Sequence, residues 1–397
     1  MTGDGVPERG ARGDAARQGS VLTVIRSEAA FIAGAISALV LYTVGAGWLD
    51  GSDATVALVF LFAWIFGVMM WGAFAALHHA DVVAERLGEP LGTVVLTISV
   101  IVIEVSVIVA VMLHGDADPT LARDTMLAVL IIVLNGMVGL ALLVGGLRHR
   151  EQSYNLQGAR AYLGVLVTLA TLLLILPTFT WTGDRNVSNA EALVFAVVTV
   201  ALYATFLALQ TTRMRGDFAE PPGAGGEGGG AVHAADPAPL AGHAGNGRST
   251  GYHALFLLLT LAPIVLLAEK LAVIVDVGIE ALHLPPALGG VLIAVLVLSP
   301  EGLAALKAAS ANNLQRAVNV CLGSALATIS LTVPAVVVIA WLAGIDVILG
   351  LEPTEIVLLV LTLVLSLVTF GGQRTNMLQG AVHLVVFFAF LVVIFDT

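Results

Sequence analysis

The sequence predicts an all-α integral membrane protein of about 11 transmembrane helices, with one extra helix followed by two inverted five-helix repeats. Three observations support this fold class. Apolar residues make up 58% of the 397 positions and charged residues only 11%, whereas a soluble domain has about a quarter of its residues charged. Several apolar runs are as long as the roughly 20 residues that a helix needs to cross a bilayer. Finally, two stretches of the second half repeat the pattern of the first.

Hydropathy along the chain predicts each span in order. The first half contains six candidate helices, at residues 28–49, 54–77, 93–113, 125–147, 161–181 and 190–211. The second half contains five, at residues 252–275, 287–306, 317–343, 354–370 and 379–395. Helices of this length span most or all of a hydrocarbon core about 30 Å thick.

Basic residues in the connections predict the orientation, because Lys and Arg accumulate on the cytoplasmic side of a membrane. If the N-terminus is cytoplasmic, fourteen of them lie inside: Arg9, Arg12, Arg17, Arg26, Arg86, Arg148, Arg150, Arg160, Arg213, Arg215, Arg248, Lys307, Arg316 and Arg374. The outer side then holds only Arg123 and Arg185. An odd number of spans places the C-terminus outside. We therefore expect a multi-pass protein of the inner (plasma) membrane, with its N-terminus in the cytoplasm.

Two segments are expected to remain outside the helix bundle. Residues 1–27 are polar and rich in Gly and Arg, which is typical of a disordered cytoplasmic tail. Residues 212–251 contain the run GAGGEGGG and are interpreted as a flexible cytoplasmic linker. The rest of the chain then divides into an extra N-terminal helix, a first repeat and a second repeat, at residues 28–49, 54–211 and 252–397.

Three patterns that resemble metal sites are interpreted otherwise. His233, His243 and His253 are irregularly spaced in or beside the linker, so we expect them to be solvated. The segment HHADVVAE, where the second span meets the cytoplasm, is not the HExxH pattern of a zinc protease. The single cysteine, Cys321, excludes an internal disulfide and is expected to be a small buried residue.

An internal repeat places one glutamate in each half. The segment GTVVLTISVIVIE ends at Glu104 and aligns with GGVLIAVLVLSPE, which ends at Glu301, 197 residues later. Each glutamate lies twelve residues after a glycine, Gly92 or Gly289. Further on, RDTMLAVLIIVLNG and RAVNVCLGSALATI align at an offset of 193 residues.

The predicted topology makes this repeat an inverted one. The third span enters from the cytoplasm and the eighth enters from outside, so the two copies cross the membrane in opposite senses. Twelve residues of helix carry each glutamate about 18 Å from its own surface, roughly halfway across the core. Inverted-repeat transporters place their substrates and coupling ions at this depth, between the two repeats.

The two buried glutamates predict a binding site for a cation and for protons. A charged carboxylate costs several kcal/mol in hydrocarbon, so an intramembrane glutamate is a functional candidate by default. Removal from water also favours the protonated form, which lets protons compete with a cation. The alternative is that Glu104 or Glu301 is a protonated structural acid, hydrogen-bonded to a neighbouring helix.

Neutral oxygens near the same depth are candidate ligands. Asn135 lies on the fourth span, and Ser324, Thr328 and Thr332 on the ninth are spaced four apart, so they share a helix face. Asn135 and Thr328 are partners in the repeat alignment, and Ser299 lies before a proline that should free carbonyl oxygens. We expect Asn135, Ser324, Thr328 and Ser299 to complete the coordination, although each is equally suited to holding helices together.

Three stretches carry a resemblance to a known family: HHADVVAERLGEPLGTVVLTISVIVIEVSVIVAVML, RDTMLAVLIIVLNGMVGLALLVGGLRHREQ and SPEGLAALKAASANNLQRAVNVCLGSALATISLTVPAVV. They resemble the ChaA-type calcium/proton antiporters of the calcium/cation antiporter superfamily. The resemblance implies one extra helix before two inverted five-helix halves, in agreement with the predicted spans. The family's paired acids fall on Glu104 and Glu301, and its acid on the preceding helix falls on Asp81. One departure concerns selectivity: Val100-Ile101 and Val297-Leu298 stand where the superfamily usually has Gly-Asn.

These observations together predict a secondary active cation/proton antiporter. Ca2+/H+ exchange is the first expectation, and Na+/H+ or K+/H+ exchange by the same fold is the alternative. Glu104 and Glu301 would bind either the cation or protons, and Asp81 would guard the cytoplasmic approach. The expected partners are the inorganic cation, protons and the lipid bilayer. No cofactor is expected, and the net charge of −11 disfavours binding to nucleic acid.

Two other classes of protein are less consistent with the sequence. An intramembrane enzyme would need a nucleophile with its base or a metal motif, and none of these spacings appears. A passive channel would need ring symmetry or a reentrant filter, whereas one acid in each inverted repeat suits alternating access. We therefore expect a transporter and not an enzyme.

Overall fold

A computed structural model describes residues 26–45, 48, 54–88, 91–112, 120–180, 189–221, 248–285, 287–345 and 347–395. Nearly all of these residues belong to helices, as the sequence predicts. Most of the expected N-terminal tail and the middle of the expected linker lie outside the described residues.

The first half of the chain begins with α2 (Ala29–Thr43), α3 (Ala54–Leu87) and α4 (Leu91–Met112). The next helix is continuous but has a π-helical middle: α5 (Leu121–Ile131), η2 (Ile132–Met137) and α6 (Val138–His149). A short strand and a second helix of this kind follow: β1 (Glu151–Ser153), α7 (Leu156–Ala170), η3 (Thr171–Ile175) and α8 (Leu176–Thr180). The half ends with α9 (Asn189–Thr211) and a 3-10 turn, η4 (Arg215–Phe218).

The second half has the same plan. It begins with α10 (Thr250–Leu282) and α11 (Ala287–Ser310). A third helix with a π-helical middle consists of α12 (Leu314–Ala327), η5 (Thr328–Thr332) and α13 (Val333–Ala343). The chain then forms α14 (Pro353–Thr369), β2 (Arg374–Asn376) and α15 (Met377–Ile394).

All eleven predicted spans correspond to helices, when each helix with a π-helical middle is counted once. Within the described ranges, eight helices are long and apolar enough to cross a membrane, and three shorter apolar helices complete the set: Ala29–Thr43, Val94–Ala110 and Pro353–Thr369. The predicted ends of α3 and α10, at residues 77 and 275, were too early, because these helices continue to Leu87 and Leu282. Hydropathy detects the apolar part of a helix and misses a polar extension that packs against other helices.

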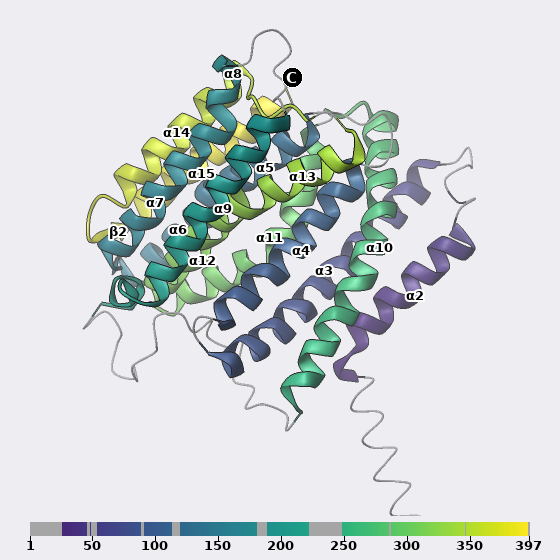
Figure 1. The fold of residues 1–397 in the computed structure, drawn as a ribbon, viewed down its shortest axis with the longest axis horizontal. Coiled ribbons are helices and arrows are strands. Elements are labelled where there is room, and N and C mark those ends of the chain that lie inside the picture. Colours follow the sequence, from purple (N-terminus) through teal and green to yellow (C-terminus); the bar gives the residue numbers. More distant parts are fainter. Residues whose placement is uncertain are drawn as a thin grey trace, which may run out of the picture.

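The two glutamate-bearing helices lie in the middle of the bundle. Figure 1 shows α4 and α11 there, with α2, α3 and α10 on one side and α6, α7, α14 and α15 on the other. Across the halves, α11 packs against α5, η2 and α6, while α4 packs against η5 and α13. The last helix of each half also crosses over, since α15 packs on α6 and α9 packs on α13. The two repeats are therefore interleaved rather than placed side by side.

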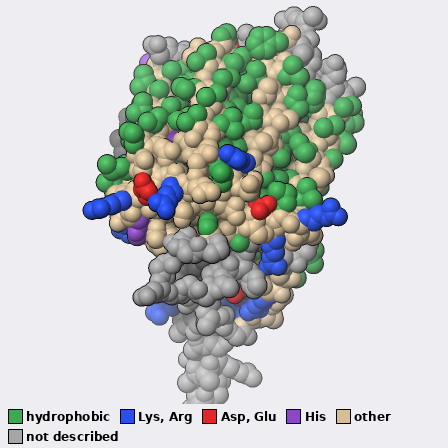
Figure 2. Space-filling view, turned by 90° about the vertical axis from the view of Figure 1, so that its left-hand side faces the viewer, with side chains coloured by type: hydrophobic (Ala, Val, Ile, Leu, Met, Phe, Trp, Pro, Cys, Tyr) green, Lys and Arg blue, Asp and Glu red, His purple; other side chains and the backbone are tan. Residues whose placement is uncertain are grey.

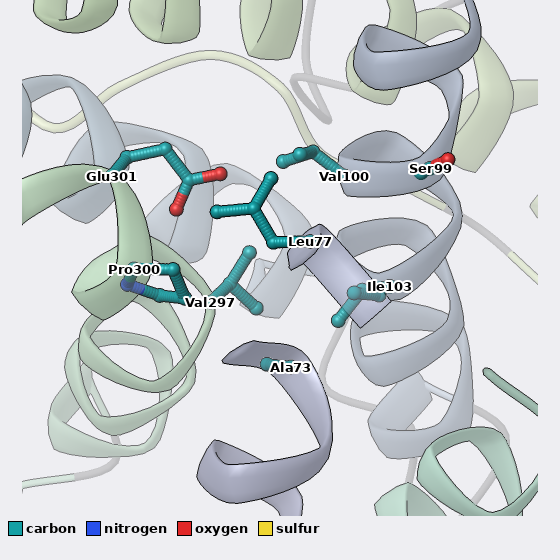
Figure 3. Close-up of a pocket in the computed structure, with 8 residues that line it drawn as sticks. All are labelled: Ala73, Leu77, Ser99, Val100, Ile103, Val297, Pro300 and Glu301. Carbon is teal, nitrogen blue, oxygen red and sulfur yellow. The ribbon is translucent and has the colours of Figure 1, made fainter. Parts of the chain in front are cut away.

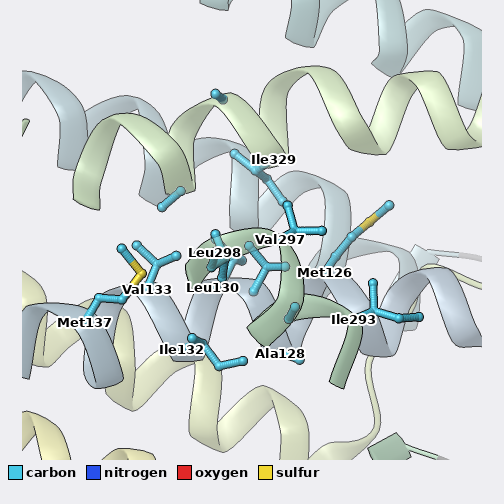
Figure 4. Close-up of a cluster of buried hydrophobic side chains, with 14 of the residues drawn as sticks. Met126, Ala128, Leu130, Ile132, Val133, Met137, Ile293, Val297, Leu298 and Ile329 are labelled. Atoms are coloured by element: carbon cyan, nitrogen blue, oxygen red, sulfur yellow. The ribbon is translucent and has the colours of Figure 1, made fainter. Parts of the chain in front are cut away.

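Apolar side chains of both halves form the core between these helices. In Figure 4, Met126, Leu130 and Val133 of the first half lie beside Leu298 and Ile329 of the second. Lipid tails are as apolar as these side chains, so close packing rather than exclusion from water holds the helices together.

Glycines allow α6 and α15 to approach backbone to backbone. A Cβ atom on Gly380 would lie 2.5 Å from the backbone nitrogen of Leu143 and 2.7 Å from the carbonyl oxygen of Gly139. Likewise, a Cβ atom on Gly146 would lie 2.5 Å from the backbone nitrogen of Met377. No larger residue fits at Gly380 or Gly146 unless the helices separate.

Contacts between connections define the two faces of the bundle. On one face β1 pairs antiparallel with β2, and Gln152 lies opposite Thr375; we call this the strand face. On the opposite face, the Leu351 N–H donates to the carbonyl of Leu174 at 3.1 Å. These pairings agree with helices that alternate in direction. Figure 2 shows Lys and Arg side chains gathered along one band, beside a largely hydrophobic surface.

The start of the expected linker is anchored, which corrects the predicted boundary at residue 212. The turn η4 packs against α7 and α9, and the Phe218 side chain is buried against the rings of Tyr162 and Phe206. The carbonyl of Phe218 accepts a hydrogen bond from Asn319 Nδ2 at 2.8 Å. The buried ring and the backbone hydrogen bond of Phe218 together fix this segment to the bundle.

Candidate cation site

The first glutamate of the site, Glu104, lies on α4. The residue is 2% exposed, and its Oε2 atom accepts hydrogen bonds from Thr332 Oγ1 at 2.8 Å and from Thr328 Oγ1 at 3.1 Å. Both threonines belong to η5, in the other half of the chain. The second carboxylate oxygen, Oε1, is buried and has no hydrogen-bond partner within the described structure. Glu104 is therefore held through one oxygen, while the other is available to a ligand.

The second glutamate, Glu301, lies on α11. Its Oε2 atom is buried and has no hydrogen-bond partner among the described residues. A small cavity between α3, α4 and α11 is lined by Glu301 together with apolar side chains, among them Leu77, Val100 and Val297. Figure 3 shows the carboxylate of Glu301 pointing toward Leu77 and Val100, which also line the cavity. The carboxyl group of Glu301 is close enough to that of Glu104 for the two to interact electrostatically. The packing of the two halves thus brings the two predicted acids near each other.

Irregular helix geometry surrounds both glutamates. Pro300 lies inside α11 next to Glu301, and since proline has no N–H it cannot donate to the carbonyl one turn earlier. The segments η2 and η5 are π-helical, and the repeat alignment places Asn135 of η2 opposite Thr328 of η5. π-Helical turns are rare and are frequent at functional sites. Hydropathy gave no indication of these turns.

The four predicted neutral ligands do not share one environment. Thr328 contacts Glu104 directly, as described above. Ser324 lies one turn earlier on α12, and neither it nor Ser299 is among the hydrogen-bond partners of the two carboxylates within the described structure. Ser299 Oγ instead donates to the carbonyl of Val295 on its own helix at 2.5 Å. For Ser324 and Ser299 the role of ligand stays a prediction.

Asn135 belongs to a separate polar network that links η2 to α14 and α15. Its Nδ2 atom donates to Thr362 Oγ1 at 2.7 Å, and its Oδ1 atom lies 3.1 Å from His383 Nδ1. The other ring nitrogen of His383 lies 2.9 Å from Thr369 Oγ1. All four residues are buried. Both polar atoms of the Asn135 amide are therefore engaged, which favours the helix-holding role over the role of ligand.

Two residues at the site were not predicted as ligands. Thr332 forms the shorter of the two hydrogen bonds to Glu104. Its four-residue spacing from Thr328 was the signal that could have identified it. Ser99 of α4 lines the cavity beside Glu301. The repeat alignment places Leu296 at the corresponding position, so no paired pattern pointed to Ser99.

Asp81 lies near the strand-face end of α3 and is half-buried. Electrostatic interactions connect it to Glu301 and to Arg316 at the start of α12. Along α3, Ala73 and Leu77 line the cavity at Glu301, and Asp81 follows at the next four-residue interval on the same helix face. This spacing places Asp81 between the cavity and the strand face.

Comparison with known proteins agrees with this arrangement of helices. A sequence model of the sodium/calcium exchanger protein family matches residues 57–212 and 252–395. The chain belongs to this family. The two matched segments lie on either side of the expected linker, and they include Glu104 and Glu301.

Two sequence relatives of this exchanger cover most of its length. It is 43% identical over 333 residues to the putative ionic transporter y4hA of Sinorhizobium fredii, covering 82% of this chain and 86% of that protein. It is 40% identical over 325 residues to the sodium-potassium/proton antiporter ChaA of Escherichia coli, covering 81% of this chain and 85% of that protein. These matches confirm the predicted resemblance, and the exchanger is a transporter and not an enzyme.

Solved structures share the fold of the exchanger. The structure of native YfkE superposes with a TM-score of 0.68 at 16% identity, covering 93% of this chain and 100% of that one. A second YfkE structure, of a protein named a Ca2+/H+ antiporter, gives a TM-score of 0.65 at 17% identity, covering 93% of this chain and 99% of that one. The sodium-calcium exchanger NCX_Mj gives a TM-score of 0.51 at 16% identity, covering 84% of this chain and 99% of that one. The predicted fold class is confirmed.

Proposed function

We propose that this exchanger is a cation/proton antiporter whose cation is Ca2+, with Glu104 and Glu301 as the shared binding site for both. One observation carries the proposal. Two carboxylates on helices from opposite halves each keep a buried oxygen, Glu104 Oε1 and Glu301 Oε2, without a hydrogen-bond partner among the residues that the structure describes. A buried acceptor that is left unsatisfied is costly unless a proton or a cation occupies it. The relatives' names, which include proton antiporters, support the same reaction.

The mechanism is competition between the cation and protons for the same two carboxylates. With the cation absent and the protons released, the site would carry two buried negative charges, which makes its movement across the low-dielectric core costly. A site that is either protonated or cation-loaded avoids that cost and can be exposed to the other side. Exchange is then obligatory, and the two acids titrate as a coupled pair.

Hard oxygen ligands suit Ca2+, which takes six to eight of them. The two carboxylates supply four oxygens, and the hydroxyls of Thr328 and Thr332 lie against Glu104. Pro300 has no N–H to donate to the carbonyl one turn earlier on α11, so the oxygen of this carbonyl is a further candidate ligand. Two acidic side chains also match the charge of a divalent cation.

The strand face is the face that we assign to the cytoplasm of a cell with an inner (plasma) membrane, because the basic connections gather there. Asp81 then concentrates cations at the cytoplasmic entrance before they reach Glu301. Protons entering from the acidic outside would drive the cation outwards. The N-terminus is cytoplasmic and the C-terminus external in this arrangement.

A second candidate is Na+/H+ or K+/H+ exchange at the same site. The 40% identical relative is named a sodium-potassium/proton antiporter, which favours this alternative. Val100-Ile101 and Val297-Leu298, in place of Gly-Asn, also remove two amide ligands that would otherwise add to the coordination of Ca2+.

Proton movement in everted membrane vesicles tests both candidates. A pH-sensitive dye reports the imposed proton gradient while Ca2+, Na+ or K+ is added. We expect Ca2+ to dissipate the gradient in wild type and to fail in Glu104→Gln and Glu301→Gln at equal expression. Glu280→Gln, at an exposed glutamate of α10, is the matched control and should retain exchange. If only Na+ or K+ dissipates the gradient, the protein is a Na+/H+ or K+/H+ antiporter and the proposal of Ca2+ as the cation is wrong. No response to any of the three cations would refute antiport.

A further inference from the structure

A second cluster of ionisable side chains lies where the start of α2 meets α3 and α10. Its members are Glu28, His79 and His253, each no more than 6% exposed. His79 Nε2 lies 3.0 Å from Glu28 Oε2, and His79 Nδ1 lies 3.0 Å from His253 Nδ1. The remaining ring nitrogen of His253, Nε2, is buried and has no hydrogen-bond partner among the described residues. We call these three residues the histidine latch.

Glu28 fixes part of the proton arrangement in the latch. Its Oε1 atom accepts hydrogen bonds from Tyr252 at 2.5 Å and from Arg248 Nη1 at 3.0 Å. Burial alone would raise the pKa of Glu28, but hydrogen bonds from the side chains of Tyr252, Ser27 and His79 hold it below its usual value. Glu28 is therefore ionised at neutral pH and accepts on both oxygens. His79 Nε2 must carry the N–H that donates to it.

The hydrogen bond between the two histidines then admits one arrangement without charge. His79 has its single proton on Nε2, so its Nδ1 accepts from the Nδ1–H of His253. His253 Nε2 carries no hydrogen in this arrangement. A bare nitrogen lone pair left without a partner is a smaller penalty than a buried N–H group without an acceptor.

Adding a proton to the two histidines creates an N–H group at His253 Nε2, whichever ring takes up the proton. On His253 it creates an N–H at Nε2. On His79 it makes His79 Nδ1 the donor, so His253 Nδ1 must accept and the proton of His253 moves to its Nε2. In both cases the pair stays together only with an N–H at His253 Nε2, facing no acceptor of the described structure.

Positive charges around the latch oppose the added proton. His253 interacts electrostatically with Arg86 and His78 of α3, in addition to His79 and Glu28. His79 also interacts with Arg248, which precedes α10. Among these groups only Glu28 is negative, and it already accepts three hydrogen bonds. A protonated pair is therefore stabilised if His253 leaves its buried position and reaches water.

We propose that His253 is a regulatory proton-binding site, at which protonation opens the latch and loosens the packing of the start of α2 against α3 and α10. The ligand is a proton: within the described residues no group of three His, Cys, Asp or Glu side chains could hold a metal ion. The site is separate from Glu104 and Glu301 and does not depend on which cation is exchanged. The opening reaches the cation path because Asp81 lies on α3 close to the latch.

Hydrogen–deuterium exchange of the amides in α2 tests the proposal on the full chain in lipid nanodiscs, at pH 7.5 and 5.5, with rates corrected for intrinsic exchange. His253→Asn keeps a donor near the Nδ1 position but cannot be protonated. His253→Leu removes the donor at both pH values. His283→Asn is the matched control, since His283 is an exposed residue with φ of 53° beyond α10, a conformation that Asn tolerates. The amides of α15 serve as an internal reference.

We expect the amides of α2 in wild type and in His283→Asn to exchange about tenfold faster at pH 5.5, which is about the largest change that losing one neutral hydrogen bond produces. His253→Asn should stay protected at both pH values, and His253→Leu should exchange fast at both. Equal protection of wild-type α2 at the two pH values would overturn the proposal. So would an acid response of His253→Asn as large as that of wild type, which would place the relevant proton on another group. If His253→Leu fails to fold, the comparison of His253→Asn with wild type still tests whether His253 binds the proton.

Discussion

The two threonine hydroxyls on Glu104 should set how well the cation competes with protons. Thr332→Val keeps the shape of the side chain and removes the 2.8 Å donor to Glu104 Oε2. A hydrogen bond to a charged group contributes about 1.5–3 kcal/mol. Removing the donor destabilises the ionised form of Glu104 and not the protonated form. Proton binding should therefore become more favourable, relative to cation binding, by the same free energy. The cation concentration for half-maximal exchange should therefore rise about ten- to a hundredfold near neutral pH.

Everted vesicles measure this concentration directly, as dissipation of the proton gradient against added cation at several pH values. Thr332→Ser keeps a hydroxyl and should stay within a few-fold of wild type. Thr328→Val removes the longer bond, at 3.1 Å, and should show a smaller increase. Thr168→Val is the matched control, because the exposed hydroxyl of Thr168 donates only to its own helix, at Gly164.

The pH series decides whether the physical reasoning holds. If the hydroxyls act by stabilising the ionised carboxylate, the defect of Thr332→Val should shrink as the pH rises and protons become scarce. An unchanged half-maximal concentration in Thr332→Val would refute the reasoning. A defect of the same size at every pH would instead show that the hydroxyl binds the cation itself.

Three further predictions follow from packing and charge outside the site. Gly380→Leu should prevent folding or lower the thermal unfolding temperature sharply, because its side chain would enter the backbone of α6 near Leu143; normal yield and stability would contradict the observed contact. Asn135→Leu should destabilise the protein by about 1–3 kcal/mol, since it leaves a polar group of His383 unpaired. If Asn135 holds helices and is not a ligand, the folded fraction should keep its cation affinity, and a tenfold loss of affinity would restore the role of ligand. Because folding lowers the pKa of Glu28, its contribution to stability is present above about pH 4.5 and is lost as the pH falls through the pKa of the folded state. Thermal unfolding of Glu28→Gln should therefore show a weaker loss of stability in acid than wild type. The same dependence of the unfolding temperature on pH in both proteins would assign the acid response to other groups.

Sequence reasoning predicted the membrane spans well because hydropathy and length are properties of single segments. It also singled out Glu104 and Glu301, which the structure places on α4 and α11 with a buried oxygen each that has no hydrogen-bond partner among the described residues, since a charge inside an apolar run is conspicuous and the repeat marks both. Sequence reasoning predicted the ends of α3 and α10 less accurately, because polar residues there remain helical through contacts that only the folded bundle supplies.

The partners of individual polar groups could not be predicted from the sequence. Asn135 has the depth and the repeat position of a ligand, yet in the structure it is bound to Thr362 and His383 from distant helices. His253 was expected to be solvated because it follows a flexible tract, whereas it is buried against His79. Sequence spacing fixes which face of a helix a residue occupies. It does not specify which other helix covers that face.

The interleaving of the two repeats limits how the molecule can change shape. Any division of the structure along the sequence halves would separate α6 from α15 and α9 from α13, and the first of these pairs meets backbone to backbone through Gly139 and Gly380. The helices α2, α3 and α10 pack on one another although α10 comes from the second half of the chain, so a mobile unit built on this group would combine pieces of both copies. A duplicated sequence thus need not yield two mechanical halves. The boundary between the two sequence repeats therefore need not coincide with the boundary between the parts of the protein that move.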